Sequence, residues 1–550
     1  MVNIISPMQS AYVPGRLISE NICLVQELVQ AMKKKKGRTG HLALKMDMSK
    51  AFDRLEWKFL MNVLKKFGFS EKFCQLIHQC ISTTQIEIMV NGSPSPSFKP
   101  TRGIRQGDPL SPYLFILAME AFSRNMNHYE VTKQLTSMKI LRSAPKINHL
   151  LFADDCLLFC KANLDQTRKL LQLIEDFSFC SGQLINFHKS AIYFTKNMSP
   201  SSFQTVSGFL QVSSPYAEFQ ITIFYHQENE LNTSKVLEEK RVKQGKATDN
   251  LEKCECSKEG GLGFRDLHLF NRALLAKSAW RLCTDQTSIC AKSLQEKYFP
   301  DGQVSNIKKS KNTTWSWTSI SSEINFILKF SFWSLGNGHK ILIWKNNWVH
   351  GMHEPPIPKQ GAINTSHYTH VYQLMAADNC SWNSDMLFSL FEDQTANAIL
   401  NINIFPDYED KLVWTLEKNG GFSVKSAYKK MFQEKNAGQI VSDAMKSVFK
   451  RLWRLPLLPR VQQFLWKCVR DVLPSRDKLM HVIQDGDYSC SFCKQVTETA
   501  SHCILECHIV HLVWKYLSDF TDMCRKKTVK PHRQNRYNLH WSPPPRGTDI

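Results

Sequence analysis

The chain has 550 residues, of which 43% are apolar and 22% are charged. These proportions are close to those of ordinary globular proteins, so they exclude a mostly disordered or fibrous chain. Lys and Arg number 70 against 49 Asp and Glu, a formal net charge of +21. An excess of this size indicates a polyanionic partner, although it says nothing about the fold. At roughly 150 residues per domain, the length predicts three or four domains.

The cysteine pattern and the hydropathy both point to the inside of a cell. The 17 cysteines are odd in number and scattered, unlike the dense, even framework of small secreted proteins. The amino-terminal residues lack the basic and apolar regions of a signal peptide. No apolar run approaches the roughly 20 residues that cross a bilayer. We therefore expect an intracellular protein without a membrane segment.

Residues 1–197 alternate apolar β-like runs with helical periodicity, which predicts a mixed α/β domain. Residues 215–258 are dominated by polar side chains, which predicts a linker or a poorly ordered segment there. We place this linker at 198–258. Helical periodicity returns at 267–282. A Gly-Asn-Gly turn at 336–338 separates FSFWSL from HKILIW, and this pattern predicts a β-hairpin.

The last third of the chain begins with a second predicted hairpin, in which Asn-Gly-Gly at 419–421 separates KLVWTLEK from FSVKSAY. Helical patterns follow in SVFKRLWRL and RVQQFLWKCV. A cluster of Cys and His residues at 490–507 then precedes an apolar helical stretch. Residues 521–550 are basic and contain three consecutive prolines, so we expect an unfolded tail.

Two adjacent acidic residues, Asp154 and Asp155, are flanked by apolar residues in LLFADDCLLF, which places them at the tip of a buried hairpin. Carboxylates close to a core are unfavourable unless positive charge compensates them. Asp47 follows another apolar strand-like run, HLALKM, directly before a predicted helix. An Asp pair at a turn is common for local reasons alone. Asp53, six residues further on, is best interpreted as a solvated helical residue.

Three carboxylates from two strand ends can hold two metal ions about 3.5–4 Å apart, the arrangement that clamps the attacking and leaving oxygens in phosphoryl transfer. Oxygen ligands of this kind favour Mg²⁺ or Mn²⁺ over zinc. The sequence therefore predicts a site for two Mg²⁺ ions at Asp47, Asp154 and Asp155.

Two further segments are candidates for nucleotide contacts. In RGIRQGDPLSPYLF, Gln106 offers a donor and Gly107 permits a close approach of the backbone. The pattern suits a nucleotide or a template strand, but it is weakly specific. In SGQLINFHKS, Lys189 is either a triphosphate contact, or a proton donor to pyrophosphate, or a solvated lysine.

A second metal site is predicted near the carboxyl end by the spacing C-x2-C-x8-H-x4-C. Its four residues are Cys490, Cys493, His502 and Cys507. Two pairs of such ligands within 18 residues are typical of a tetrahedral structural zinc site. The alternative is a set of reduced cysteines with a surface histidine. Cys503, His508 and His511 lie nearby, so the ligand set is open by one residue.

Five segments together resemble a known family. They are QSAYVPGR, KMDMSKAFD, RGIRQGDPLSP, HLLFADDCLLF and SGQLINFHKS, and their order and spacing are similar to those of reverse transcriptases, most of all those of plant non-LTR (LINE-type) retrotransposons. The resemblance implies that Asp47, Asp154 and Asp155 are the metal-binding aspartates of the polymerase palm. It also implies that Phe52 screens the sugar 2′ position and that Gln106 lies in the motif lining the nucleotide site.

The resemblance extends to the carboxyl-terminal part, where residues 420–520 are similar to the zinc-binding domain of these elements. Residues 259–350 resemble their connecting region, and 351–419 are an α+β linker. The implied fold is an α/β (α+β) palm with partial fingers, a Trp-rich α+β connecting region and a mostly helical zinc-binding domain.

The resemblance implies RNA-directed DNA polymerisation in the nucleus, with an RNA template, a DNA primer and dNTPs as partners. Family members carry further fingers residues before QSAYVPGR and a helical thumb after SGQLINFHKS, which residues 198–258 do not resemble. Impaired activity is therefore expected. A catalytically inactive, nucleic-acid-binding remnant of a retroelement is the alternative, and a group II intron maturase is a third, because it shares the SKAFD and ADD segments.

Overall fold

The computed structural model describes residues 1–210, 265–437 and 443–527, except 2, 38, 305, 309–311, 353, 363–364, 379 and 481–485. Within the predicted linker, residues 200–210 form a helix, whereas 211–258 lie outside the described residues, as does the tail beyond residue 527. The described chain packs as two units, of which the first comprises 1–210 with 267–437 and the second 443–527.

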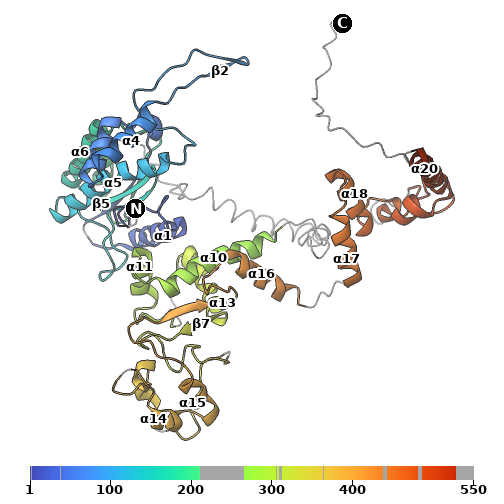
Figure 1. Ribbon diagram of the computed structural model, residues 1–550. Coiled ribbons are helices and arrows are strands. Elements are labelled where there is room, and N and C mark those ends of the chain that lie inside the picture. The colour runs from blue at the N-terminus through green and yellow to red at the C-terminus, as the bar shows by residue number, and fades with distance from the viewer. Residues whose placement is uncertain are drawn as a thin grey trace. The chain divides into compact units, whose positions relative to one another are not determined.

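The first unit contains most of the regular structure (Figure 1). Its helices are α1 (Ile18–Lys34), α2 (Ala51–Arg54), α3 (Trp57–Lys66), α4 (Glu71–Ser82), α5 (Ser111–Val131), α6 (Leu164–Ser181), α7 (Pro200–Leu210), α10 (Leu267–Thr284), α11 (Ile289–Tyr298), α12 (Trp315–Ser322), α13 (Ile324–Lys329), α14 (Ser384–Leu390), α15 (Asp393–Leu400) and α16 (Val424–Lys435), with short 3₁₀ turns at Thr365–His367 and Val371–Leu374. Its strands are β1 (His41–Met46), β2 (Met89–Val90), β3 (Ser93–Pro94), β4 (His149–Phe152), β5 (Asp155–Lys161), β6 (Ala191–Phe194), β7 (Ser331–Ser334) and β8 (Lys411–Trp414).

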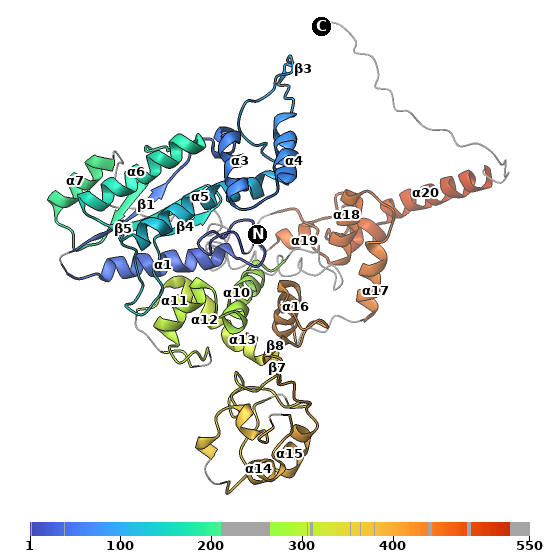
Figure 2. The same cartoon turned by 60° about the vertical axis from the view of Figure 1, so that its left-hand side comes forward.

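A four-stranded antiparallel sheet with the order β4-β5-β1-β6 forms the centre of the first unit. The predicted LLFADDCLLF hairpin is confirmed, since β4 pairs with β5 and Phe152 lies opposite Asp155. In β1, His41 pairs with Lys161 at one end and Met46 with Cys156 at the other. Helix α1 covers one face of the sheet, and α5 and α6 cover the other (Figure 2).

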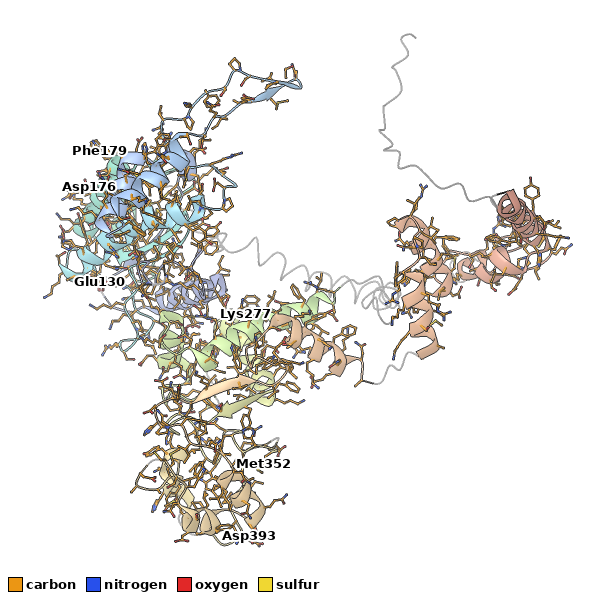
Figure 3. The ribbon with its side chains drawn as sticks, in the orientation of Figure 1. Glu130, Asp176, Phe179, Lys277, Met352 and Asp393 are labelled. Carbon is orange, nitrogen blue, oxygen red and sulfur yellow. The ribbon has the colours of Figure 1, made fainter. Side chains whose placement is uncertain are left out.

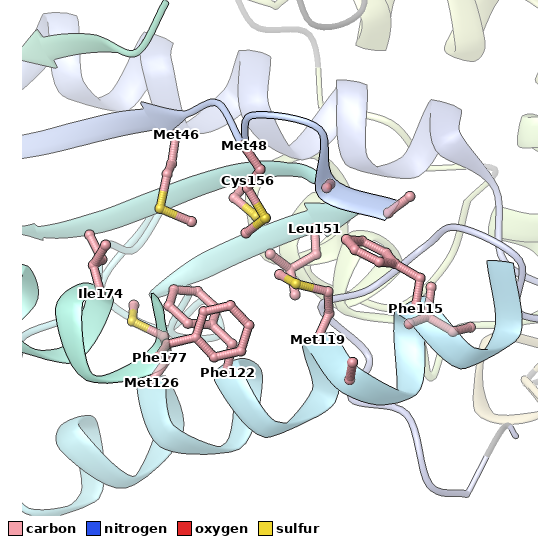
Figure 4. Close-up of a cluster of buried hydrophobic side chains, with 14 of the residues drawn as sticks. Met46, Met48, Phe115, Met119, Phe122, Met126, Leu151, Cys156, Ile174 and Phe177 are labelled. Carbon is pink, nitrogen blue, oxygen red and sulfur yellow. The ribbon is translucent and has the colours of Figure 1, made fainter. Parts of the chain in front are cut away.

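The core between the sheet and α5 explains why these segments fold together. Met46 and Cys156 from the strands meet Phe122 of α5 and Phe177 of α6, which are buried (Figure 4). The rings of Phe122 and Phe177 lie 5.0 Å apart. Each buried aromatic side chain contributes about 1.5–3 kcal/mol relative to an exposed one. This packing fixes the strands whose ends carry the predicted carboxylates.

A second core joins α1 to the connecting region. Glu27 of α1 is fully buried, and it pairs with Lys297 and accepts hydrogen bonds from the hydroxyl groups of Tyr298 (2.7 Å) and Thr314 (2.6 Å). The Tyr298 ring stacks on Trp317 at 4.2 Å. Helices α10 to α12 are therefore an integral part of the first unit (Figures 1 and 2).

The predicted hairpin between FSFWSL and HKILIW is wrong. Strand β7, from the first of these segments, pairs with β8 instead. The Gly-Asn-Gly turn does form, but the carboxylate of Asp410 accepts hydrogen bonds from the backbone N–H groups of Gly336, Gly338 and Lys340. Because Asp410 directly precedes β8, these bonds bring β8 alongside β7.

The predicted hairpin at 419–421 is also wrong, because FSVKSAY begins helix α16. The Ser423 hydroxyl accepts the N–H of Ser426 and caps the helix, as serine does at many helix starts. Helix α16 packs against α10, so the break in packing follows residue 437 rather than 420.

Residues 335–410 form a separate hydrophobic core within the first unit. They lie between β7 and β8, which form a two-stranded sheet separate from the central one. Trp348 and Phe391 are fully buried at the centre of this core, and α14 and α15 pack around it. The stretch predicted as an α+β linker, 351–419, thus lies mostly within a packed module.

The second unit is mostly helical, with α17 (Asp443–Leu452), α18 (Pro459–Val469), α19 (Arg476–Leu479), a π-helical turn (His502–Glu506) and α20 (His508–Lys527). The helices predicted in SVFKRLWRL and RVQQFLWKCV are confirmed as α17 and α18, which pack through Phe449 and Trp466. Helix α20 continues to Lys527. The prediction that the chain is unfolded from residue 521 is therefore wrong for residues 521–527. In the described parts of the chain, no helix has the length and apolarity that crossing a membrane requires.

Candidate active site and metal centre

The strand pairing brings the three predicted aspartates to one end of the sheet. Met46 and Cys156 are the last residues to pair between β1 and β5, and Asp47 and Asp155 come next along the two strands. Asp154 lies beside Asp155 in the turn between β4 and β5. The predicted convergence of two strand ends is thus what the backbone shows.

The electrostatics of these carboxyl groups reflect the same proximity. Burial and the neighbouring charge of Asp154, with a further contribution from Asp47, raise the pKa of Asp155 to about 6. Burial also raises the pKa of Asp154, and the charge of Asp47 adds to the effect. The charge of Lys45 opposes the rise at Asp155. Like charges near a core favour the neutral acid unless a cation is added.

The donor set fits divalent metal ions. Asp47, Asp154 and Asp155 offer only carboxylate oxygens, which Mg²⁺ prefers. Within the described residues, no ion pair joins Asp154 or Asp155 to a basic side chain. A bound cation would therefore supply the charge that this cluster lacks.

The turn that carries Asp154 is held by a residue that sequence reasoning missed. Ala153 has a φ of +56°, a left-handed conformation that is uncommon outside glycine. The side-chain oxygen of Gln9, 1% exposed, accepts the backbone N–H groups of Ala153 (3.1 Å) and Ala11 (2.9 Å). Gln9 is the first residue of the QSAYVPGR segment, so this segment positions the turn. The resemblance of QSAYVPGR to a reverse transcriptase motif was the only sequence feature that pointed to Gln9.

Asp47 is positioned by the SGQLINFHKS segment. Its backbone N–H donates to the Ser190 hydroxyl (3.2 Å), and its carbonyl accepts the N–H of Asn186 (2.9 Å). Lys189 lies in the same turn with an exposed side chain. The structure therefore brings Lys189 into the neighbourhood of Asp47, but it gives no contact between the two side chains.

Phe52 of α2 contacts both helix α5 and the RGIRQGDP loop. The rings of Phe52 and Phe115 are stacked, with their centroids 4.8 Å apart. The backbone carbonyl of Phe52 accepts the N–H of Ile104 (2.9 Å). A Cβ at Gly103 would lie 2.5 Å from the Asp53 carbonyl oxygen, so this contact requires glycine. The loop is thereby fixed directly on α2.

Gln106 and Gly107 follow in that loop. Gln106 is exposed and lines a cavity of about 300 Å³ together with Asp53, which is also exposed. Gly107 has a φ of +87° with open space around it. Both residues therefore lie where an incoming molecule can reach them, although the three aspartates are not part of this cavity lining.

The four residues of the predicted zinc site converge in the second unit. One ligand atom from each of Cys490, Cys493, His502 and Cys507 lies within 4.8 Å of all the others. The Cys493 sulfur and the His502 Nε2 are 3.3 Å apart. Zinc–sulfur bonds of about 2.3 Å place neighbouring ligands at comparable separations in a tetrahedral site.

Local structure and protonation both suit this metal centre. The backbone turn between the first two cysteines closes with Lys494, whose φ is +59° and whose N–H donates to the Cys490 carbonyl. Hydrogen bonds from the backbone of Gln495 and from His502 lower the pKa of Cys493 to about 6. A thiolate is the form that binds zinc. Burial instead raises the pKa of Cys503 to about 11.

Comparison with known proteins agrees with both sites. Residues 1–237 match the family model of the reverse transcriptase (RNA-dependent DNA polymerase), and residues 422–514 match that of the zinc-binding region in reverse transcriptase. The first match contains all three aspartates, and the second contains the four zinc-site residues.

Individual relatives are more distant and longer. A protein of Arabidopsis thaliana that is named as a ribonuclease H protein is 26% identical over 274 residues, 48% of this chain and 42% of that protein. A retrovirus-related Pol polyprotein from the type-2 retrotransposable element R2DM of Drosophila melanogaster is 29% identical over 33% of this chain and 16% of the polyprotein. This chain thus spans less than half of either relative.

Among solved structures, telomerase from Candida tropicalis matches 34% of this chain and 30% of its own, with 15% identity and a TM-score of 0.26. The two family matches are the findings that classify the chain. Residues 1–237 are similar to the reverse transcriptase family, and residues 422–514 are similar to the zinc-binding domains of reverse transcriptases.

Proposed function

We propose that this chain is the RNA-directed DNA polymerase part of a LINE-type retroelement. In this reaction the 3′-hydroxyl of a primer attacks the α-phosphate of a dNTP, a new P–O bond forms, and pyrophosphate leaves. The observation that carries the proposal is the convergence of Asp47 and Asp155 at adjoining strand ends, beside Asp154, within the part of the chain that matches reverse transcriptases.

The proposed roles follow from the geometry and from the resemblance. Asp47, Asp154 and Asp155 would hold two Mg²⁺ ions, which when bound neutralise the charge that develops on the phosphate oxygens. Phe52, held by Phe115, would screen the sugar 2′ position.

The remaining proposed contacts surround the nucleotide. Gln106 and Gly107 would contact it from an exposed loop. Lys189, exposed beside the backbone of Asp47, would contact the triphosphate or give a proton to the leaving pyrophosphate. The proposed site of action is the nucleus, as the family resemblance implies.

Primer extension on a homopolymer RNA template tests this proposal. The Asp154→Asn/Asp155→Asn variant should lose Mg²⁺-dependent dNTP incorporation by on the order of 10³-fold, about 4 kcal/mol of barrier. Asp176→Asn is the control, because Asp176 is an exposed aspartate on α6 that does not line the cavity of Gln106, and it should change the rate less than about threefold. Equal incorporation by the double variant and the unmodified chain would instead favour the nucleic-acid-binding remnant.

We further propose that Cys490, Cys493, His502 and Cys507 bind one structural Zn²⁺. Metal analysis of the purified full chain should find close to one zinc ion per chain. Cys490→Ser should lose that zinc and destabilise the second unit, because the free energy of structural zinc binding is also free energy of folding. Cys503→Ser is the control and should retain the metal. Zinc loss in both variants, or in neither, would contradict this ligand set.

A further inference from the structure

The first unit contains a second cavity, far from the aspartates, with a volume of about 800 Å³. It is lined by the end of α1, the segment between α5 and β4, the first residue of β1 and the last residue of β5. Six residues separate His41 from Asp47, and a strand rises about 3.3 Å per residue. The cavity therefore lies roughly 20 Å from the carboxylate cluster, at the opposite end of β1.

The lining of this cavity carries more positive charge than its ion pairs compensate. Six basic residues in it have no ion pair within the described residues: Lys34, Lys35, Lys133, Lys139, Arg142 and Lys161. Glu130, near the carboxyl end of α5 (Figure 3), also lines the cavity. Its carboxylate is occupied by Lys146 (3.7 Å) and by the side-chain amide of Asn148 (2.9 Å).

A second observation points to an anionic ligand. His41 pairs directly with Lys161 across the β1–β5 ladder, and its Nδ1 is buried without a hydrogen-bond partner within the described residues. Burial and the charge of Lys161 lower the pKa of Lys35. Burial, together with the charges of Lys35 and Lys161, lowers the pKa of His41 to about 4. The fold thus holds two lysines and an unpartnered imidazole together at a cost that an anion would relieve.

The shape of the cavity and its apolar residues narrow the kind of anion. A volume of 800 Å³ corresponds to a cube about 9 Å across. A double helix is wider across than its own major groove, which is roughly 12 Å wide, so it does not fit inside a cavity of this size. Leu135, Met138 and Ile140 form an apolar lining between the lysines. Bases of an unpaired strand can lie on such a surface, whereas those of a duplex are stacked inside.

We propose that this basic cavity binds the phosphodiester backbone of a single-stranded nucleic acid. The site is a second nucleic-acid contact, separate from the proposed polymerase centre. It would hold a strand about 20 Å from the reacting phosphate.

The test measures binding of a labelled, 20-nucleotide single-stranded RNA to the full chain by fluorescence anisotropy. All proteins carry Asp154→Asn/Asp155→Asn, and the buffer contains EDTA, so the result does not depend on polymerase activity. The test variant is Lys34→Gln/Lys133→Gln/Arg142→Gln, which removes three exposed charges from the cavity rim. The control is Lys418→Gln/Lys425→Gln/Lys429→Gln, which removes three exposed charges elsewhere in the first unit.

We expect the rim variant to bind at least about tenfold more weakly at 0.1 M salt and the control to change less than about threefold. The slope of log affinity against log salt should fall by up to about 2, since each single-strand phosphate contact contributes about 0.7. A blunt RNA duplex of the same length should lose no more affinity with the rim variant than with the control.

An equal loss of RNA affinity in the two triple variants would overturn the proposal, because the loss would then depend only on the net charge of the protein. A duplex affected as strongly as the single strand would also overturn it. If inorganic tripolyphosphate at millimolar concentration displaces the RNA from the unmodified cavity only, recognition of phosphate is supported. Displacement that is equal in the rim variant counts against recognition of phosphate by the cavity.

Circular dichroism and thermal midpoints check that each variant is folded. The double variant Lys133→Gln/Arg142→Gln, confined to one loop, replaces the triple variant if that one unfolds.

Discussion

Two carboxylate sites in the first unit differ in their burial and in how the protein compensates their charge. Glu27 in α1 is fully buried, and it is matched by Lys297, Tyr298 and a threonine hydroxyl. Asp154 is exposed and Asp155 is half-buried, and their like charges repel each other, with Lys45 as a nearby cation. The acid of α1 has its partners inside the fold, whereas within the described residues the aspartate pair has no ion-pair partner.

The largest expected effect is a difference in stability between variants of the two carboxylate sites. Glu27→Gln should lower the free energy of unfolding by about 3–5 kcal/mol, because it leaves the Lys297 ammonium without its counter-charge and sets an amide N–H donor against it. Asp154→Asn/Asp155→Asn should leave stability unchanged or raise it by about 1 kcal/mol in EDTA, since it removes repulsion. Urea denaturation followed by tryptophan fluorescence measures both. A loss of stability of similar size in the two proteins would contradict the distinction.

A smaller effect extends the comparison to a buried base. His149 is fully buried between Ser123 (2.8 Å) and Asn148 (2.6 Å), and burial lowers its pKa to about 3. In the unfolded chain its pKa is about 6.5, so the unfolded state binds a proton first as the pH falls. Its contribution to stability is therefore complete above pH 6.5 and declines from there towards pH 3.

At pH 5 the loss from His149 amounts to about 2 kcal/mol. In His149→Gln the decline in stability between pH 7.5 and 5 should be smaller than in the unmodified chain by about this amount. His128→Gln, at an exposed position of α5, is the control. Urea denaturation at the two pH values measures the difference, and an undiminished decline in His149→Gln would show that another group governs it.

The smallest expected effect is on the turn that carries the aspartates. Gln9→Leu removes the acceptor for the Ala153 N–H, so the rate of incorporation should fall about tenfold, or 1.4 kcal/mol. The Mg²⁺ concentration for half-maximal activity should rise as well, because Gln9 acts by positioning Asp154. Gln166→Leu is the control: Gln166 is equally buried but accepts the N–H groups of Thr136 and Lys161 at the other end of the strands. Equal effects on activity would make Gln9 merely structural.

The sequence was sufficient to predict the carboxylate hairpin, because its pattern is local: apolar runs on both sides of Asp154 and Asp155 leave few other arrangements. The same holds for the spacing of Cys490 and Cys493. The roles of Gln9 and Asp410 could not be predicted, since each side chain binds backbone that is distant along the chain. The predicted hairpin at 336–338 failed for that reason, because the hydrogen bonds of Asp410 accompany the pairing of β7 with β8. The predicted hairpin at 419–421 failed for a local reason, because Ser423 caps helix α16 directly after the glycines.

The pairing of β7 with β8 makes the residues between them an insertion. Ser334 lies opposite Lys411, so the chain leaves and re-enters the sheet at neighbouring points, and everything between has its own core. Replacing 336–409 with a two-residue Asn-Gly turn should therefore yield an ordinary tight hairpin and leave the rest of the first unit folded. We expect that this stretch can be exchanged or removed without altering the β4-β5-β1-β6 sheet, whose strand ends carry the aspartates.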